Sequence, residues 1–312
     1  MVKILEEAEI RQAISLSGAR EAMSNAFATL AAGDAIAPDE LAMKLKHGGE
    51  LHVKGAYLGG DWIAFKAATG QFPGGGNSGF TAVLSADTGA PVAILQDGGW
   101  LTEIRTAAAS ALSASVLARP GSTSLAILGG GFQASYQVAA YRDAFALTDV
   151  TVWSRSVQTA ERFAAENDAV AVASISDAVA DADIVVCCTP STEPLLDFEM
   201  LQPGTHITAV GADMIGKREL ASDVLERCDI LTCDSVEVSA AVGELQHATG
   251  LRHRAVDLGS ILNGAAEART SDQQITVSDL CGLGVQDAAM AELVMTSLEM
   301  TSLEMTSPGA EQ

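Results

Sequence analysis

The chain has 312 residues, and its formal net charge is −22 because 40 acidic side chains outnumber 18 basic ones. This length predicts about two domains, and the acid excess argues against a nucleic-acid partner, which needs clustered lysine and arginine. The chain shows no apolar stretch of membrane-spanning length, and its first twenty residues are too charged for a signal peptide, so we expect no membrane contact and a cytoplasmic location.

The first part of the chain is predicted to mix helix and strand. An amphipathic helix is expected over residues 1–20, and two apolar, β-branched segments at 50–58 and 62–69 are typical of strands. Residues 80–100 are predicted to form two strands joined at the sequence ADTGAP, where Asp, Gly and Pro favour a turn.

A helix is predicted over residues 101–118, where alanine, leucine and isoleucine dominate. The Pro/Gly/Ser-rich stretch 119–124 follows this helix and is the expected domain boundary. We therefore predict a first domain over residues 1–118.

After the boundary, apolar strands alternate with helical stretches. The strands are expected at 125–128, 150–153, 169–173, 183–189, 206–212 and 229–234. This alternation predicts a parallel sheet covered by helices on both faces. The chain ends in tandem copies of MTSLE, which extend a terminal helix and to which we assign no function.

The stretch SLAILGGGFQA resembles the glycine turn of dinucleotide-binding proteins. Gly129, Gly131 and Ala134 fit the pattern G-x-G-x-x-A, and the pattern follows a strand and opens a helix. Gly129 would allow the tight turn, Gly131 would let a pyrophosphate approach the backbone, and Ala134 would let helix and strand pack closely. The amides at the helix N-terminus would bind the phosphates.

The next strand indicates which dinucleotide binds. An NAD site usually has an acidic residue at the end of this strand, but here the strand runs into Ser154, Arg155 and Ser156. A cation and two hydroxyls suit a 2′-phosphate, so NADP(H) is preferred and NAD(H) remains possible. Alternatively, Arg155 is only a solvated loop residue.

Metal chemistry is not expected. The five cysteines include no Cys-x-x-Cys pair, their number is odd, and the five histidines show no metal-ligand spacing. We therefore expect neither a disulfide framework nor a metal site.

Six blocks together resemble the ornithine cyclodeaminase/μ-crystallin family, and the resemblance covers nearly the whole chain. The blocks are FKAATGQFPG, LTEIRTAAASA, LGGGFQA, VGADMIGKREL, GELQHA and SDLCGLGVQD. The resemblance implies a Rossmann NAD(P)-binding domain at 119–284 and a mixed α+β substrate-binding and dimerisation domain at 1–118. The C-terminal helix, from about 285 to 305, would return to the domain at 1–118. The strand-rich region 50–100 has few turns to cover its edges, and unpaired edges invite a partner, so we expect a homodimer through this domain.

The resemblance also implies four residues that act on the substrate. Lys66 matches the family's active-site lysine, Arg105 the arginine that holds the substrate carboxylate, Asp213 the acid–base aspartate of the cyclodeaminases, and Glu50 a glutamate of the same pocket. These residue types suit the chemistry, because arginine binds a carboxylate through two parallel hydrogen bonds. A lysine or carboxylate with a shifted pKa can move the protons of the amine.

Four further positions match residues that contact the nucleotide in the family. Thr81, Gln133 and Lys217 correspond to nucleotide contacts, and Thr189 follows a strand end on the nicotinamide side.

The chain departs from the cyclodeaminases near Glu50. A second carboxylate-binding arginine stands about eleven residues before that glutamate in the family, whereas this neighbourhood is PDELAMKLKHGGE. Lys44, Lys46 or Lys54 could take its place. Leu280 and Cys281 also replace a serine and a valine, and these departures argue against ornithine as the substrate.

Three functions remain open at this stage. The first is an NAD(P)H-dependent imino-acid or ketimine reductase, or an alanine-dehydrogenase-like enzyme, acting on the C–N bond of a small α-amino or α-imino acid. The second is an ornithine or lysine cyclodeaminase, an ammonia lyase that keeps its nucleotide bound. The third is a non-catalytic binding protein of the μ-crystallin type.

Overall fold

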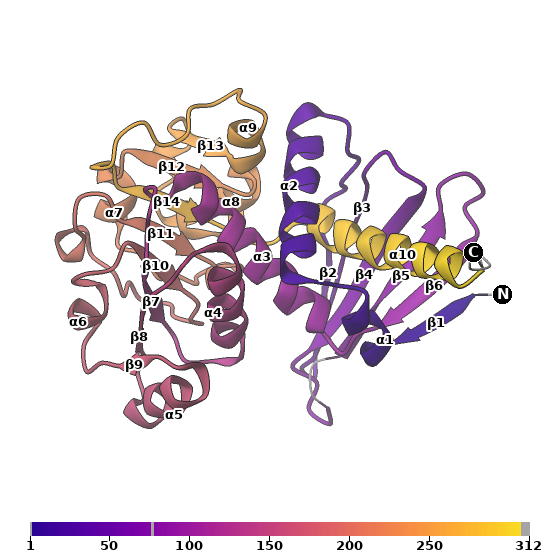
Figure 1. Ribbon diagram of the computed structural model, residues 1–312, viewed down its shortest axis with the longest axis horizontal. Helices are drawn as coiled ribbons and strands as arrows, with labels where there is room; N and C mark the ends of the chain where they lie inside the picture. Colours follow the sequence, from indigo (N-terminus) through magenta and orange to yellow (C-terminus); the bar gives the residue numbers. More distant parts are fainter. Residues whose placement is uncertain (1, 76–77, 307–312) are drawn as a thin grey trace, which may run out of the picture. The chain divides into compact units, whose positions relative to one another are not determined.

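The computed structural model describes residues 2–75 and 78–306, the last six of these by their backbone alone (Figure 1). By contacts, the chain divides into two compact units, Met1–Arg105 with Leu283–Gln312, and Thr106–Gly282. The division falls inside helix α3 (Trp100–Leu117) rather than at the predicted stretch 119–124. The reason is that Ala107, Ala111 and Ala114 of α3 belong to the core of the second unit.

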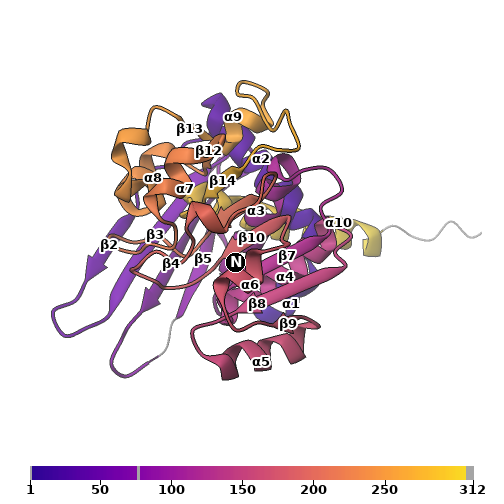
Figure 2. The same cartoon turned by 90° about the vertical axis from the view of Figure 1, so that its left-hand side faces the viewer.

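The first unit is built on a six-stranded sheet with the order β1-β6-β5-β4-β3-β2. Its strands are β1 (Lys3–Glu6), β2 (Leu41–Lys44), β3 (Glu50–Tyr57), β4 (Trp62–Gly70), β5 (Ser78–Ser85) and β6 (Pro91–Gln96). Figure 2 shows β2 to β5 lying side by side. Neighbouring strands are antiparallel except for β1 and β6, which are parallel.

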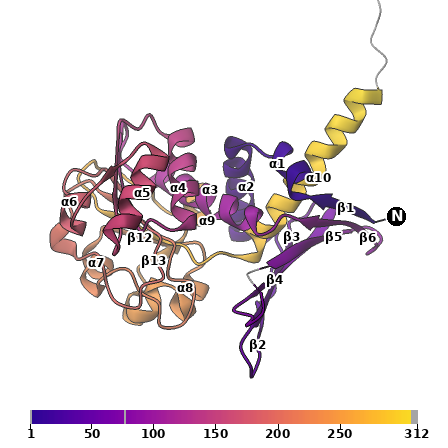
Figure 3. The ribbon, with the colours of Figure 1, turned by 90° about the horizontal axis from the view of Figure 1, so that it is seen from below.

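Three helices accompany this sheet: α1 (Glu7–Gln12), α2 (Leu16–Ala32) and α10 (Gly284–Thr306). Helix α2 begins at Ser15, whose hydroxyl accepts a hydrogen bond from the Gly18 amide, and ends at Gly33 in the left-handed conformation. Helix α10 packs against α2 and against β3 and β4 (Figure 3). The MTSLE copies up to residue 306 extend α10, and the tail from residue 307 lies outside the described residues.

The prediction of one helix over residues 1–20 is wrong. Residues 3–6 form the strand β1, which pairs with β6 about ninety positions later in the chain, and two separate helices follow. This pairing buries Leu5. Such long-range pairing leaves no local signal in a sequence that otherwise has helical periodicity.

The second unit holds an eight-stranded parallel sheet with the order β13-β12-β14-β11-β10-β7-β8-β9. Its strands are β7 (Ser124–Leu128), β8 (Asp149–Trp153), β9 (Val170–Ala171), β10 (Ile184–Cys187), β11 (His206–Ala209), β12 (Ile230–Cys233), β13 (Ala255–Asp257) and β14 (Thr276–Asp279). Its α-helices are α4 (Phe132–Ala144), α5 (Val157–Asn167), α6 (Ile175–Val179), α7 (Ser222–Arg227), α8 (Val236–Val242) and α9 (Leu258–Leu262), with short 3₁₀ turns η1 (Phe198–Met200), η2 (Glu244–His247) and η3 (Thr249–Leu251).

The strand order changes direction between β7 and β10, as in a doubly wound nucleotide-binding sheet. The predicted fold class, a Rossmann sheet plus a mixed α+β unit, is thus confirmed. Details of this sheet differ: β9 is shorter than the predicted 169–173, and neither β13 at the edge of the sheet nor β14 in its middle was predicted.

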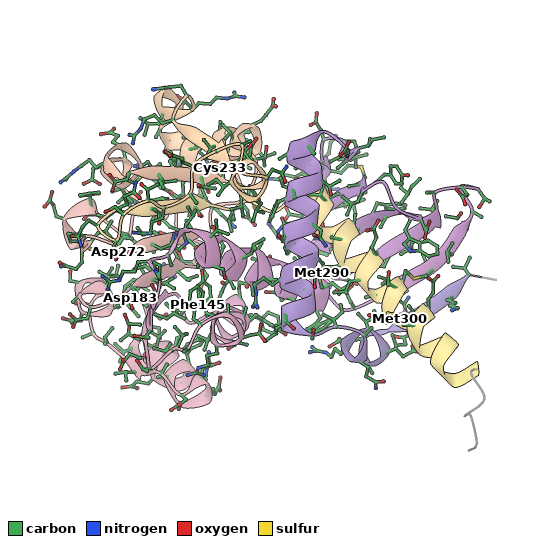
Figure 4. The ribbon with its side chains drawn as sticks, turned by 45° about the horizontal axis from the view of Figure 1, so that its top comes forward. Phe145, Asp183, Cys233, Asp272, Met290 and Met300 are labelled. Atoms are coloured by element: carbon green, nitrogen blue, oxygen red, sulfur yellow. The ribbon has the colours of Figure 1, made fainter. Side chains whose placement is uncertain are left out.

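Successive residues of β7 lie in two different cores. Leu125 and Ile127 pack in one buried cluster, and Ala126 and Leu128 in another, because side chains alternate between the faces of a strand. Asp183, which is labelled in Figure 4, joins the starts of β7 and β10. Its carboxylate accepts hydrogen bonds from the amides of Thr123 and Ser124. In the described part of the chain, no helix is long and apolar enough to cross a membrane.

Candidate functional site

Lys66 carries a buried ammonium group in the first unit. It lies on β4, its side chain is 12% exposed, and its Nζ donates hydrogen bonds to Asp287 Oδ1 at 2.8 Å and Thr102 Oγ1 at 3.0 Å. A lysine is rarely buried without a partner, because desolvating its charge is costly. Lys66 is therefore held in a defined position by two side chains from different helices.

Asp287 reaches this position because α10 begins directly on β3. A Cβ atom on Gly284 would lie 2.5 Å from the carbonyl oxygen of Gly55, so only glycine allows this close approach. Asp287 stands in the first turn of α10, where the helix dipole favours a negative charge.

Arg105 is the second cation beside Asp287. Its side chain is 10% exposed, and its Nε lies 3.5 Å from Asp287 Oδ1. Within the described residues, Arg105 Nε and Asp287 Oδ2 are buried without a hydrogen-bond partner, and the two terminal guanidinium nitrogens of Arg105 also donate no hydrogen bond. Buried donors normally have acceptors, so the outer edge of this guanidinium suits a ligand.

Two cations therefore share the one carboxylate of Asp287. Burial would raise the pKa of Asp287, but the nearby Lys66 and Arg105 charges lower it, so this carboxylate stays ionised. Burial, reinforced by the Arg105 charge, lowers the pKa of Lys66 despite the opposing effect of Asp287. Lys66 is thus the group in the cluster whose proton is most easily moved.

Asp97 supports the same cluster from the start of α3. Its Oδ2 accepts a hydrogen bond from the Leu101 amide at 2.7 Å, and burial raises the pKa of its carboxyl. Asp97 thereby fixes the first turn of α3, which carries Thr102 and Arg105.

The arrangement can do two things chemically. Arg105 can bind a carboxylate through two parallel hydrogen bonds, and Lys66 can give a proton to, or take one from, an atom of the bound molecule. The described residues of this cluster thus suit an α-amino or α-imino acid.

The structure brings Thr81 to this cluster but not Glu50. Thr81 on β5 is the cross-strand neighbour of Lys66, as Lys54 is on β3. Glu50 lies on the same sheet face but four residues along β3 from Lys54, about 13 Å at the usual rise per residue. There its carboxylate accepts a hydrogen bond from Gln71. Glu50 is therefore not part of the Lys66–Asp287–Arg105 cluster.

The glycine turn in the second unit has the geometry that a dinucleotide needs. Gly129 has φ +121°, and a Cβ there would lie 2.8 Å from the Cys188 carbonyl oxygen. Apart from its two neighbours in the chain, no described residue comes within 4 Å of a Cβ built on Gly131, the residue before the first turn of α4, whereas Ala134 is fully buried. The turn thus leaves open space at the helix N-terminus, where a pyrophosphate would fit.

The loop after β8 lies beside this turn. The Gly129 amide donates to the Trp153 carbonyl oxygen, and a Cβ on Gly130 would lie 3.5 Å from the Ser154 Cβ. Ser156 caps α5 by accepting a hydrogen bond from the Thr159 amide. Arg155 is exposed and forms no ion pair with the described residues, so its charge is available to a ligand.

The remaining predicted residues of the second unit lie in three places. Asp213 and Lys217 form an ion pair, with Lys217 Nζ 2.5 Å from Asp213 Oδ1. Gln133 lies in the first turn of α4 and accepts a hydrogen bond from Gln137. Thr189 follows β10 and donates to Glu219 through both its amide and its hydroxyl.

The family model named "Ornithine cyclodeaminase/mu-crystallin family" matches residues 1–302. The chain belongs to this family. The resemblance expected from the sequence is therefore confirmed.

Relatives in the ornithine cyclodeaminase/mu-crystallin family match over almost the whole chain. Alanine dehydrogenase from Archaeoglobus fulgidus is 31% identical over 93% of each chain. The structure of an archaeal alanine dehydrogenase dimer with bound NAD matches with a TM-score of 0.88 and 28% identity, covering 96% of this chain and 97% of that one. Iminosuccinate reductase of Paracoccus denitrificans in complex with NAD⁺ matches with a TM-score of 0.87 and 29% identity, covering 97% and 98%.

Asp287, Thr102 and Asp97 were not predicted as site residues. Asp287 lies in the block SDLCGLGVQD that carries the family resemblance. Asp287 also stands at the start of an expected helix, where acidic residues are common. That position alone does not distinguish a residue that stabilises the helix from a residue of the functional site.

Proposed function

We propose that the chain is an NAD(P)-dependent oxidoreductase that acts on the C–N bond of a small α-imino or α-amino acid. The observation that carries this proposal is the Lys66–Asp287–Arg105 cluster, in which a buried arginine has unused donors beside a lysine with a lowered pKa. The proposal is further supported by family relatives that are named alanine dehydrogenase and iminosuccinate reductase.

Arg105 would bind the α-carboxylate of the substrate and fix the position of its Cα. The terminal nitrogens of its guanidinium can donate two parallel hydrogen bonds, and Asp287 holds the Nε side. Burial would strengthen the pair between Arg105 and the substrate carboxylate, because little water competes for that carboxylate.

Lys66 would supply the proton when the imine is reduced. Gly129 and Gly131 would hold the dinucleotide, and its nicotinamide would supply the hydride for the imine carbon. The nitrogen then gains a proton, and Lys66 Nζ is the donor whose proton the cluster holds least tightly. In the reverse direction, Lys66 would accept the proton from the amine.

The substrate test follows from these roles. The protein should be mixed with NADPH or NADH and with pyruvate plus ammonia, cyclic imines, or ornithine and lysine, while the nicotinamide absorbance is recorded. An imine reductase consumes the reduced nucleotide in proportion to the product formed. If the protein binds the nucleotide and a substrate but converts neither of them, it is non-catalytic, and this result would contradict the proposal.

We further propose that the nucleotide is NADP(H) in preference to NAD(H). The exposed Arg155 and the hydroxyls of Ser154 and Ser156 stand beside the glycine turn, with no carboxylate at the end of β8. The family relatives described above carry NAD, so the preference of this chain needs its own measurement.

Replacing Ser154 by aspartate is expected to shift the preference toward NAD(H). The new carboxylate would repel a 2′-phosphate and accept hydrogen bonds from the ribose hydroxyls, so the ratio of NADPH to NADH affinity should fall about tenfold or more. The measurement is nucleotide binding by fluorescence, with Ser271→Asp, at an exposed residue before the start of β14, as the control. A wild-type protein that already prefers NADH would contradict the proposal that Arg155 binds the 2′-phosphate.

A homodimer through the first unit is our third proposal. The sheet face opposite α10 carries Leu41, Met43, Ile63 and Phe80, each between 37% and 52% exposed. A hollow of about 610 Å³ lies among apolar residues of this face, including Leu41 and Ile63. An apolar surface of this kind favours a partner, and the archaeal alanine dehydrogenase is described as a dimer.

Light scattering at micromolar concentration should give twice the mass of one chain. Phe80→Glu should produce monomers, because it places a charge within the apolar face, whereas Ile215→Glu, at an exposed apolar residue of the other unit, should not. A monomeric wild type, or dissociation by both variants, would rule out this interface.

A further inference from the structure

A buried carboxylate joins the loops that follow two neighbouring strands of the Rossmann sheet. Glu219 is fully buried; its Oε1 accepts hydrogen bonds from the Thr189 amide at 2.6 Å and the Thr189 hydroxyl at 2.7 Å. Its Oε2 accepts a hydrogen bond from the Gly211 amide at 2.8 Å. Thr189 follows β10 and Gly211 follows β11, so one side chain connects both strand ends.

The backbone around this carboxylate is closely packed. A Cβ on Gly211 would lie 2.1 Å from the Thr189 carbonyl oxygen and 2.6 Å from the Glu219 carboxyl carbon. A Cβ on Gly129, in the glycine turn after β7, would lie 3.0 Å from Thr189 Cγ2. The position of Thr189 therefore depends on Glu219, and the position of Thr189 in turn determines how much space lies beside the Gly129 backbone.

These strand ends are where a dinucleotide would bind. In a doubly wound sheet, the ligand lies outside the carboxyl ends of the strands at the point where the strand order changes direction. Here that point lies between β7 and β10. The second mononucleotide half of the sheet begins at β10, so Thr189 stands where the nicotinamide half of the nucleotide is expected.

We propose that Glu219 is a positioning residue that holds Thr189 and Gly211 in the geometry required by the nicotinamide end of the cofactor. This inference rests on the proposed function. Glu219 itself touches neither substrate nor cofactor, and it acts through the two loops.

A carboxylate is needed because both of its oxygens accept hydrogen bonds. Glutamine at this position has one acceptor oxygen and one NH₂ donor, so in either orientation one loop amide would face a donor. Burial raises the pKa of Glu219 to about 7, whereas its hydrogen bonds and Lys217 favour the ionised form. Glu244, which accepts a hydrogen bond from the Glu219 amide, and Asp279 are the other carboxylates of this region.

The test compares Glu219→Gln with Asp183→Asn. Both carboxylates are buried and both accept backbone amides, but Asp183 binds the amides of Thr123 and Ser124 at the starts of β7 and β10, the opposite end of these strands from Thr189. Glu219→Gln should raise the KM and Kd for the nucleotide about tenfold with the substrate KM within about twofold of wild type, and Asp183→Asn should change nucleotide affinity less than about twofold.

Thr189→Val completes the comparison, because it removes only the hydroxyl that donates to Glu219. The effects of Thr189→Val and Glu219→Gln on nucleotide affinity should be clearly less than additive in the double variant. If Glu219→Gln does not fold, Thr189→Val should still weaken nucleotide binding, whereas Thr189→Ser, which keeps the hydroxyl, should bind like wild type.

The outcomes separate this inference from the proposed function. A wild-type protein that binds neither NADPH nor NADH would overturn the proposed function. A wild type that binds nucleotide, with Glu219→Gln binding it equally well, would overturn the positioning role alone. Equal losses in Glu219→Gln and Asp183→Asn would also overturn it, because they would indicate general destabilisation of the sheet.

Discussion

Lys66→Met is expected to lower kcat by about 10³-fold, because general acid–base catalysis contributes about 10²- to 10⁴-fold. Methionine matches the length of lysine, but it cannot move a proton. Arg105 remains beside Asp287 in this variant, so the buried carboxylate keeps one of its two cations. Steady-state kinetics with the imino-acid substrate measures the loss.

A second substitution distinguishes the loss of a transferable proton from the loss of the positive charge at position 66. Arginine at position 66 would keep a positive charge beside Asp287, but its pKa is too high for it to release a proton near neutral pH. Lys66→Arg should therefore be nearly as inactive as Lys66→Met, while Lys3→Met, at an exposed lysine of β1, should be fully active. Near-normal turnover in Lys66→Met, or recovery in Lys66→Arg, would contradict a proton-transfer role.

Arg105→Lys is expected to lower kcat/KM about 10²-fold, since a lost charged contact of roughly 3 kcal/mol corresponds to that factor. Lysine keeps the charge but loses the planar fork that binds a carboxylate through two parallel hydrogen bonds. The substrate would then bind more weakly, and its Cα would be misplaced for hydride transfer.

The matched control is Arg227→Lys. Arg227 pairs with Glu199 on the surface of the second unit, so this change should leave kcat/KM unaltered. Nucleotide affinity should stay within a few-fold of wild type in Arg105→Lys and Lys66→Met, because the glycine turn belongs to the second unit. Loss of nucleotide binding in either variant would mean that the residue serves the cofactor or the fold instead.

Features that depend on local sequence could be predicted. The glycine turn is one, because Gly129, Gly131 and Ala134 stand between a strand and a helix, and the structure has β7 and α4 on either side of them. The parallel sheet is another, since apolar strands alternate with helices along the chain.

Features that depend on distant contacts could not be predicted from spacing. Asp287 is 221 positions from Lys66, and the two meet only because Gly284 lets α10 begin on the backbone of Gly55. Glu219 was not singled out from the sequence, because its hydrogen bonds to Thr189 and Gly211 exist only where the ends of β10 and β11 are adjacent.

Strand β14 escaped prediction for a different reason. Its four residues, Thr276–Asp279, include only one large apolar side chain, although all four are buried in the middle of the sheet. A short strand with polar residues carries little periodicity. Thr276 and Ser278 have hydrogen-bond partners inside the protein, as in the bond between the hydroxyls of Ser113 and Ser278, whereas Asp279 Oδ1 has none among the described residues.

The most direct test of the proposed activity is a single assay that follows nicotinamide absorbance and free ammonia together. With NADPH and an α-imino acid, the account predicts that the absorbance falls in proportion to the amino acid formed, and that Arg105→Lys and Lys66→Met abolish or greatly slow this fall. Release of ammonia from ornithine or lysine with no net change in absorbance would contradict it and would identify a cyclodeaminase.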